Sequence, residues 1–318
     1  MKAIVVAVNG GPEKSALTEI PTPDPKFGEV RIKVARAGVN YLDVYQRQGA
    51  LPAPFVAGVE GLGRVDATGP GVDPAMLGRR VGWLGGQGSF AEFVTMPEDR
   101  TVAVPDDIDD DIAIALLMQG LTAHYLATTA FAVNTASTVL IHAGAGGVGR
   151  LLIQVAKHLG ATVIATASTA AKRRIAVDAG ADHAVDYEAF ATSAKQLTNG
   201  VGVDVVYDGV GKDTVEQDLP ALAIRGTLIV IGAASGTPPA VEFAALAAKS
   251  LTITRPSIAH YTARPGELTR RAEEVFQWAR DGILTANVAG RYRLEDVSKA
   301  QQDLQSRSIS GKLVVDIE

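Results

Sequence analysis

The sequence of 318 residues contains no cysteine. This absence excludes disulfide bonds, cysteine nucleophiles and zinc sites that depend on thiolate ligands. Histidine is scarce as well, and no two of the five histidines have the spacing of a metal-binding pair: His124, His142, His158, His183 and His260. Because His142 ends an apolar run, we expect a hydrogen-bonded structural histidine there rather than a metal ligand. No metal site is predicted.

The chain also lacks a strong charge of either sign. Its net charge of −5 gives no general attraction to nucleic acid or to membranes. The N-terminal apolar run is too short for the usual layout of a signal peptide, and we expect no apolar run to cross a bilayer. With 47% hydrophobic and 20% charged residues, the composition predicts a packed protein rather than a disordered chain. We therefore expect a cytoplasmic enzyme without nucleic-acid or membrane partners.

A glycine-rich stretch in the middle of the chain organises the rest. Thr138–His142 is a short, β-branched apolar run that predicts a strand. Gly144, Gly146 and Gly149 follow at G-x-G-x-x-G spacing, and apolar residues then recur with helical periodicity. A further strand, Thr162–Ala167, completes a βαβ unit. Such glycines allow backbone to approach a pyrophosphate, and the helix N-terminus favours an anion. The stretch predicts a dinucleotide site.

The remaining pattern predicts an α/β fold with a second, β-rich part. A helix is expected over 112–129 and another over 266–281. Further strands alternate with helices, as in a doubly wound parallel sheet, at 183–187, 203–207, 226–231 and 251–254. Residues 1–115 instead show short strands between Gly/Pro turns, which is typical of a small barrel-like β domain. The strand expected at 312–317 would rejoin that domain.

The residues after the second strand of the βαβ unit indicate which dinucleotide binds. Sites that prefer NAD often place an acid about 20 residues after the first glycine. Here Thr166–Thr169 contains none, and Lys172 and Arg173 follow. Cations and hydroxyl groups suit a 2′-phosphate, whereas a carboxylate would repel it. We therefore expect NADP(H), although both cations could also be solvated residues at a helix start.

Several ordered motifs resemble one family over essentially the whole chain. The chain is similar to the medium-chain dehydrogenase/reductase superfamily, and most of all to its zinc-independent quinone oxidoreductase branch, the zeta-crystallin-like enzymes. The matching segments are Val39–Asp43, Gly58–Val65, Gln119–Ala123, His142–Gly149, Asp208–Gly211, Thr254–Ser257 and Ser310–Lys312.

The resemblance implies a GroES-like catalytic domain built from residues 1–116 and 262–318. A Rossmann NADP(H)-binding domain, residues 117–261, would be inserted into it. It also implies a homodimer formed through the edge of the Rossmann sheet, where the strand at 251–254 is apolar and β-branched.

Departures from the zinc-dependent relatives matter equally. Those relatives place cysteine at Asn40 or its neighbour and histidine at Val59, and they carry a four-cysteine structural lobe that this chain lacks. Glu60 alone cannot form a tetrahedral zinc site. We therefore expect no metal and no oxidation through a zinc alkoxide.

By the same resemblance, individual residues are assigned to NADPH. The cofactor contacts it implies are Thr122, Gly144, Gly146, Gly147, Val148, Gly149, Ser168, Lys172, Tyr187, Gly232, Ala233, Ser257 and Arg307. Among these, Ser168, Lys172 and Tyr187 would surround the 2′-phosphate. Tyr187 could equally be a strand-end aromatic without a ligand.

The resemblance places the catalytic residues in the segment Asn40–Tyr45. A tyrosine that matches Tyr45 lies near the substrate in relatives, and a phenol can donate a hydrogen bond to a product oxygen. Tyr41 could cover the nicotinamide. Asn40 could bind substrate or only hold a turn, and Tyr45 could be a half-buried aromatic of the β domain.

Three functions remain open at this point. The first is reduction of a quinone by NADPH, which needs no metal because the acceptor is already electrophilic. The second is NADPH-dependent reduction of an activated C=C bond in an enone or enal. The third is a non-catalytic protein that binds NADPH or RNA or serves a structural role. The intact glycine motif and the acidic balance favour the enzymes.

Overall fold

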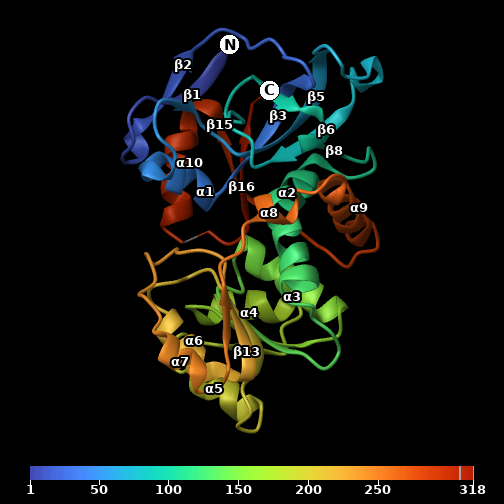
Figure 1. The fold of residues 1–318 in the computed structure, drawn as a ribbon. Coiled ribbons are helices and arrows are strands. Elements are labelled where there is room, and N and C mark those ends of the chain that lie inside the picture. Colours follow the sequence, from blue (N-terminus) through green and yellow to red (C-terminus); the bar gives the residue numbers. More distant parts are fainter. Residues whose placement is uncertain (308, 318) are drawn as a thin grey trace. The chain divides into compact units, whose positions relative to one another are not determined.

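The computed structural model describes residues 1–307 and 309–317. The chain forms two compact units (Figure 1). Unit 1 comprises Met1–Leu121, Thr262–Arg280 and Thr285–Glu318, and unit 2 comprises Thr122–Tyr261 and Asp281–Leu284. The domain boundaries expected after residues 116 and 261 stay a prediction, because compactness alone does not define an independently folding domain.

Unit 1 is rich in β structure, as expected. Its strands are β1 Lys2–Val6, β2 Ser15–Glu19, β3 Glu29–Val39, β4 Phe55–Val56, β5 Glu60–Thr68, β6 Arg80–Leu84, β7 Phe93–Pro97, β8 Thr101–Ala103, β15 Val288–Arg293 and β16 Lys312–Asp316. Its helices are α1 Tyr41–Tyr45, α9 Glu267–Arg280 and α10 Val297–Gln305. Single helical turns occur at Pro12–Lys14, Gln46–Ala50, Pro74–Met76, Glu98–Arg100 and Leu294–Asp296.

The long strand β3 is the centre of the larger unit 1 sheet, whose order is β15-β16-β3-β5-β6-β8, with β7 also paired to β3. A smaller sheet has the order β2-β1-β4. The C-terminal strand β16 pairs antiparallel with β3, so that Leu313 lies opposite Val39. The prediction that the chain end rejoins the N-terminal part is therefore confirmed.

Helix α1 directly follows Asn40, the residue after β3. Asn40 has extended backbone and caps the helix. The carboxylate of Asp43, three residues later, accepts a hydrogen bond from the Asn40 main-chain N–H at 2.7 Å. This reciprocal capping is the reason why such a short helix forms at the end of β3.

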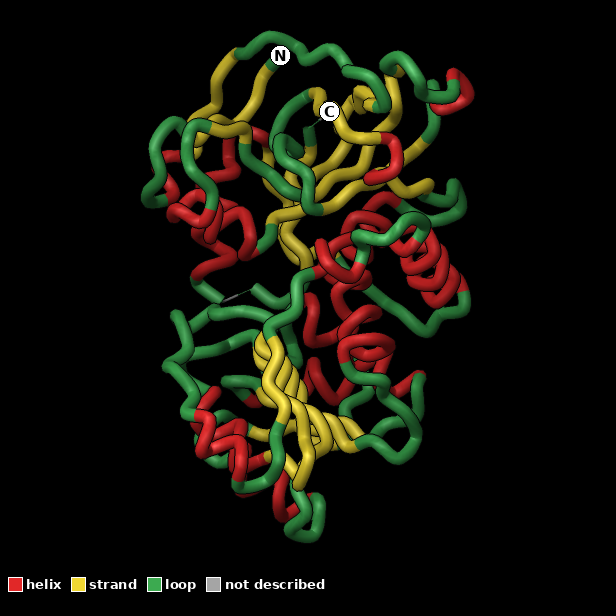
Figure 2. The backbone as a smooth tube through the Cα atoms, viewed as in Figure 1, coloured by secondary structure: helices red, strands yellow, loops and turns green. Residues whose placement is uncertain are grey.

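Unit 2 has the strands β9 Thr138–Ile141, β10 Thr162–Thr166, β11 His183–Val185, β12 Val203–Asp208, β13 Leu222–Val230 and β14 Thr252–Thr254. Its helices are α3 Gly147–His158, α4 Ala170–Asp178, α5 Phe190–Leu197, α6 Val215–Ala221, α7 Phe243–Ala247 and α8 Ile258–Tyr261. All six strands lie side by side in one parallel sheet (Figure 2).

The strand order in unit 2 is β11-β10-β9-β12-β13-β14. Counted within unit 2, the first strand, β9, therefore lies beside both the second, β10, and the fourth, β12. This is the order of the doubly wound dinucleotide-binding fold, which binds its ligand at the carboxyl ends of the strands, where the order reverses. The predicted α/β fold class is confirmed, and the reversal lies next to the loop that carries the glycine motif.

Helix α2, Asp110–Tyr125, begins in unit 1 and ends in unit 2, and a further turn, Leu126–Ala130, extends it. From the sequence, no apolar run was expected to be able to cross a membrane. The helix Asp110–Ala130 is nevertheless long and apolar enough to do so by length and composition alone, with a mean hydropathy of 1.3. Because 78% of the apolar window is buried within the protein, the apolarity has the ordinary explanation of a core helix.

Candidate functional site

The glycine motif forms a tight connection from β9 to α3. Gly146 caps α3 with extended backbone, and no side chain occupies the cap. The first N–H groups of the helix consequently face outward at its positive end, which is an arrangement that suits a phosphate group. The motif therefore has the local structure that the sequence predicted for a pyrophosphate site.

Two of the glycines are required by close packing. A Cβ atom on Gly144 would lie 2.8 Å from the Cβ of Ala165 on the neighbouring strand. A Cβ on Gly149 would overlap the carbonyl oxygen of Ala143. Gly144 thus lets the loop lie against β10, and Gly149 lets the first turn of α3 lie against the loop.

Ala143, the first residue of the loop, has a left-handed backbone with φ of 52°. This conformation costs an L-residue about 1–2 kcal/mol and needs support from its surroundings. The Ala143 carbonyl accepts a hydrogen bond from the Gly146 N–H at 2.8 Å. Its own N–H donates to the hydroxyl of Tyr187 at 3.0 Å. Tyr187 is therefore part of the structure that holds the glycine loop.

The residues expected at the 2′-phosphate lie at the carboxyl ends of β10 and β11. Thr166 and Val185 are opposite one another at the ends of these strands. Ser168 and Tyr187 each follow two residues further on. Ser168 is exposed, and Lys172 is half-buried in the first turn of α4. The Thr169 hydroxyl caps that helix by accepting from the Lys172 N–H at 3.2 Å. Ser168, Lys172 and Tyr187 thus all follow the carboxyl ends of two neighbouring strands.

The other predicted cofactor residues are more spread out. Gly232 and Ala233 follow β13, and the N–H of Gly232 donates to the carbonyl of Asp208 at 3.3 Å. They therefore lie at the carboxyl end of the sheet. Thr122 is buried near the end of α2, and Ser257 is exposed after β14.

Arg307 belongs to unit 1, where its charge opposes the rise that burial causes in the pKa of Tyr41. The Tyr41 hydroxyl donates to the carbonyl of Leu304 at 3.2 Å. Its ring centroid lies 6.1 Å from that of Tyr45, which is half-buried. The structure therefore brings Tyr41, Tyr45 and Arg307 into one neighbourhood. Their assignment to catalysis or to the cofactor stays a proposal.

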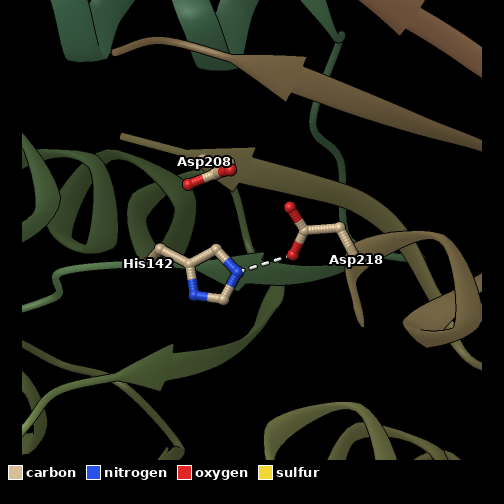
Figure 3. Close-up of side chains that lie close together, drawn as sticks. All are labelled: His142, Asp208 and Asp218. Atoms are coloured by element: carbon tan, nitrogen blue, oxygen red, sulfur yellow. Dashed lines mark hydrogen bonds and ion pairs between the residues drawn. The ribbon is translucent and has the colours of Figure 1, made fainter. Parts of the chain in front are cut away.

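His142, which directly precedes the glycine loop in the chain, belongs to a buried polar cluster that was not expected from the sequence (Figure 3). The His142 ring is hydrogen-bonded at both nitrogens, at 2.7 Å to Asp218 and at 2.8 Å to Thr166. The Asp208 carboxylate lies beside this pair, and all three acid and base groups are buried. The prediction that His142 is a hydrogen-bonded structural histidine is borne out by these two bonds.

A second buried cluster lies in unit 1 at the end of β3. The Lys312 ammonium forms an ion pair with Glu60 and donates to the amide oxygen of Asn40 at 3.1 Å. The Asn40 amide nitrogen donates to Glu60 at 2.9 Å and to the carbonyl of Gly38 at 3.2 Å. Both amide hydrogens of Asn40 are thereby used within unit 1. Of the two roles left open for Asn40, this geometry favours holding the turn.

Removing one partner from such a buried ion pair costs about 3–5 kcal/mol, because an uncompensated charge remains. Glu60 is held by two further groups, since its Oε1 accepts from the Met118 N–H at 2.6 Å and its own N–H donates to Ser89 at 3.1 Å. The cluster therefore fixes the backbone at the start of α1, which carries Tyr41 and Tyr45.

Comparison with known proteins agrees with the fold described above. Residues 26–106 match the family model described as the alcohol dehydrogenase GroES-like domain, and residues 147–274 match that of the zinc-binding dehydrogenases. A quinone oxidoreductase of Pseudomonas aeruginosa is 36% identical over 99% of this chain and 99% of its own. The chain belongs to the medium-chain dehydrogenase/reductase superfamily, in its zinc-independent quinone oxidoreductase branch.

Two other relatives of this superfamily are informative. A 2-haloacrylate reductase of a Burkholderia species is 36% identical over 98% of both chains. A mycobacterial protein solved in complex with NADPH is 45% identical, with a TM-score of 0.96 over 100% of both chains. The predicted family, and the GroES-like and Rossmann-type parts, are confirmed.

The zinc named in one family model does not fit the residues present in unit 1. By the resemblance, the zinc-ligand positions are Asn40 or its neighbour and Val59, and none of these residues is a cysteine or a histidine. The remaining carboxylate, Glu60, is bound by the Lys312 ammonium. An amide, an alkyl group and an already neutralised carboxylate are not a zinc ligand set. No reaction step is therefore assigned to zinc.

Gly149→Ala should destabilise the protein by about 1–3 kcal/mol, although alanine is the better helix former. The added Cβ would meet backbone, namely the Ala143 carbonyl, which cannot move aside as a flexible side chain can. Gly209→Ala is the matched control, because a Cβ there would have no heavy atom within 4 Å. Urea denaturation of both variants measures the difference. Equal stability of the two variants would contradict this account of the loop.

Asp43 generates a pH-dependent prediction. Burial raises its pKa from 3.8 to about 7, although the Asn40 N–H and Lys312 oppose the rise. Between about pH 4 and 7 the folded protein therefore keeps a proton that the unfolded chain has released, so stability falls as pH rises. Asp43→Asn should remove this dependence. Relative to wild type, the variant should gain about 2–3 kcal/mol of unfolding free energy between pH 5 and pH 8. A stability difference that is the same at both pH values would refute the assignment.

Proposed function

We propose that this protein is a quinone reductase that transfers a hydride from NADPH to a quinone without a metal. The observation that carries the proposal is the glycine-lined start of α3, where no side chain caps the helix. This start lies at the strand-order reversal of a six-stranded parallel sheet. This is the site at which such sheets bind a dinucleotide. The full-length similarity to a quinone oxidoreductase supports the acceptor class.

NADPH is favoured over NADH by the groups around the end of β10. No carboxylate stands in Thr166–Thr169, where one would repel a 2′-phosphate, while Ser168, Lys172 and Tyr187 offer hydrogen bonds and positive charge. The similar mycobacterial protein was solved with NADPH bound. The first residues of α3 would hold the pyrophosphate, and Gly232 and Ala233 would border the ribose on the nicotinamide side.

The protein's own contribution to the reaction is binding and polarisation, while the cofactor supplies the hydride. We assign to Tyr45 the hydrogen bond to the oxygen that gains negative charge as a quinone accepts the hydride. Tyr41 covers the reacting ring. Asn40 keeps the segment in place through its bonds to Glu60 and Lys312, because its amide hydrogens are already used.

A second candidate reaction is the reduction of an activated C=C bond. The 36% identity to a 2-haloacrylate reductase over nearly the whole chain favours it specifically. The cofactor site and the hydride step would be the same in both reactions. A non-catalytic role in binding NADPH or RNA has less support, because a net charge of −5 does not favour nucleic acid. We place the enzyme in the cytoplasm.

NADPH and NADH oxidation should be followed with a panel of quinones and enones, for wild type, Lys172→Ala and Arg174→Ala. We expect quinone-dependent oxidation of NADPH in preference to NADH. Lys172→Ala should raise the KM for NADPH by about tenfold or more, the equivalent of about 1.4 kcal/mol, without affecting the KM for NADH. Arg174→Ala is the control, because it removes the same charge from an exposed position on the same helix.

Each other result has a defined meaning. Turnover with enones alone would replace the quinone reductase proposal by the C=C reductase. Equal use of NADH and NADPH, unchanged in Lys172→Ala, would overturn the cofactor assignment. NADPH binding without turnover of any acceptor would leave the non-catalytic role.

We also propose a homodimer in which β14, the edge strand of the unit 2 sheet, pairs with its copy across a two-fold axis. Sedimentation velocity should give a particle of twice 33.1 kDa. Thr252→Lys places a charge on the exposed face of β14 and should shift the protein toward monomer. Thr162→Lys, at an exposed position of the inner strand β10, should stay dimeric. A monomeric wild type would refute the dimer.

A further inference from the structure

We propose that His142, with Asp218 and Asp208, is a positioning residue for the phosphates of the cofactor. It acts by holding the left-handed turn at Ala143 from which the glycine loop starts. The inference rests on the proposed function, because it concerns how NADPH is held, but it assigns a role to three buried residues that are not among the proposed cofactor contacts.

The cluster joins three strand ends of the same sheet edge. His142 follows β9 and bonds Thr166, the last residue of β10, through its Nδ1 atom at 2.8 Å. Its Nε2 atom bonds Asp218 of α6 at 2.7 Å (Figure 3). Asp208 is the last residue of β12. One imidazole thus fixes the position of β9 relative to its neighbour and to a helix, directly before the loop begins.

Asp208 is itself held firmly in place. Its carboxylate accepts hydrogen bonds from the N–H groups of Val210 and Gly211 at 2.7 and 3.0 Å. It also accepts one from the Thr214 hydroxyl at 2.9 Å. The three donors therefore fix the Asp208 carboxyl group in its position beside Asp218.

From His142 the connection to the loop has two routes. The first is covalent, because Ala143 is the next residue and has a φ of 52°. The second runs through Tyr187, whose ring stacks on the imidazole with centroids 5.8 Å apart. The hydroxyl of that tyrosine accepts from the Ala143 N–H at 3.0 Å. Both routes hold the same strained residue, whose carbonyl in turn receives the Gly146 N–H that begins α3.

The cluster is most simply satisfied when Asp218 shares a proton. Its Oδ2 atom is buried and has no hydrogen-bond donor among the described residues. Burial raises the pKa of Asp218 to about 6 against the opposing effect of His142, and Asp208 adds to the rise. Among the described residues, the titratable side chains that act on Asp218 are those of His142 and Asp208. A proton on Oδ2 could be donated to Asp208, which would join all three groups in one hydrogen-bonded unit.

One potential ligand atom from each of His142, Asp208 and Asp218 lies within 4.8 Å of the other two, a spacing at which a bound cation has to be considered. The distances favour a proton. His142 Nε2 and Asp218 Oδ1 are 2.7 Å apart, whereas two ligands of a tetrahedral zinc ion are separated by roughly 3.3 Å. The three hydrogen-bond donors on Asp208 also occupy lone pairs that a metal would need.

The test measures NADPH affinity by fluorescence, together with kcat and KM, at pH 7. His142→Phe keeps a ring against Tyr187 and Phe190 but removes both hydrogen bonds. We expect the Kd for NADPH to rise at least tenfold, while kcat at saturating NADPH changes less than about twofold. Asp204→Ala is the control. Asp204 accepts a hydrogen bond from the Thr138 N–H at the opposite end of the same sheet, where the strands begin, so its loss should leave the Kd unchanged.

Two rescues separate positioning from general stability. Glycine adopts positive φ without steric cost. Adding Ala143→Gly to His142→Phe should therefore lower the Kd for NADPH at least threefold relative to His142→Phe alone. Asp218→Asn can still accept from His142 and can donate to Asp208, and should bind NADPH within about threefold of wild type. Asp218→Leu can do neither and should bind more weakly than Asp218→Asn. If His142→Phe does not fold, the comparison of Asp218→Asn with Asp218→Leu still tests the inference.

Several results would overturn the inference. They are unchanged NADPH affinity in a folded His142→Phe, no rescue by Ala143→Gly, or equal affinity in the two Asp218 variants. One equivalent of divalent metal in purified wild type that is lost in Asp218→Asn would also overturn it, in favour of a metal site. If wild type itself neither binds NADPH nor reduces a quinone, the proposed function fails instead.

Discussion

The site in unit 2 depends on one backbone constraint, the left-handed turn at Ala143. The chain must leave the buried end of β9 and enter α3 within a few residues. It does so by placing a non-glycine residue at a φ of 52°. The close approach of Gly149, the carbonyl bond to Gly146 and the hydroxyl of Tyr187 all converge on this residue. If the turn relaxed, the N–H groups at the start of α3 would no longer be held in the direction that a phosphate requires.

A different arrangement holds the backbone in unit 1, where helix α1 follows the end of β3. There the backbone is fixed by charge rather than by strain. The ion pair of Glu60 and Lys312 uses both sides of the Asn40 amide, and the cap formed by Asp43 begins helix α1. Because these groups bind one another, the Asn40 amide and the Glu60 carboxylate serve to hold the backbone at the start of α1.

Local sequence patterns were sufficient to predict the α/β class and the local structure of the glycine loop, whereas the GroES-like part was expected from the family resemblance. The β-branched run before the glycines and the spacing of Gly144, Gly146 and Gly149 are short-range signals, and the structure places them as expected. The buried clusters could not be found in this way. His142 and Asp218 are separated by 76 residues and Glu60 and Lys312 by 252, so only the folded topology brings them together. One signal was available, since Asp208 directly follows a predicted strand and the carboxyl ends of parallel strands meet at one edge.

The most direct measurement is a crystal structure of the protein with NADPH bound. The account predicts pyrophosphate oxygens within hydrogen-bond distance of the N–H groups of Gly146–Gly149, with Ala143 still at positive φ. It also predicts the adenosine 2′-phosphate beside Ser168 and Lys172. A dinucleotide bound away from the β9–α3 loop, or a loop in which Ala143 has returned to negative φ, would contradict the account.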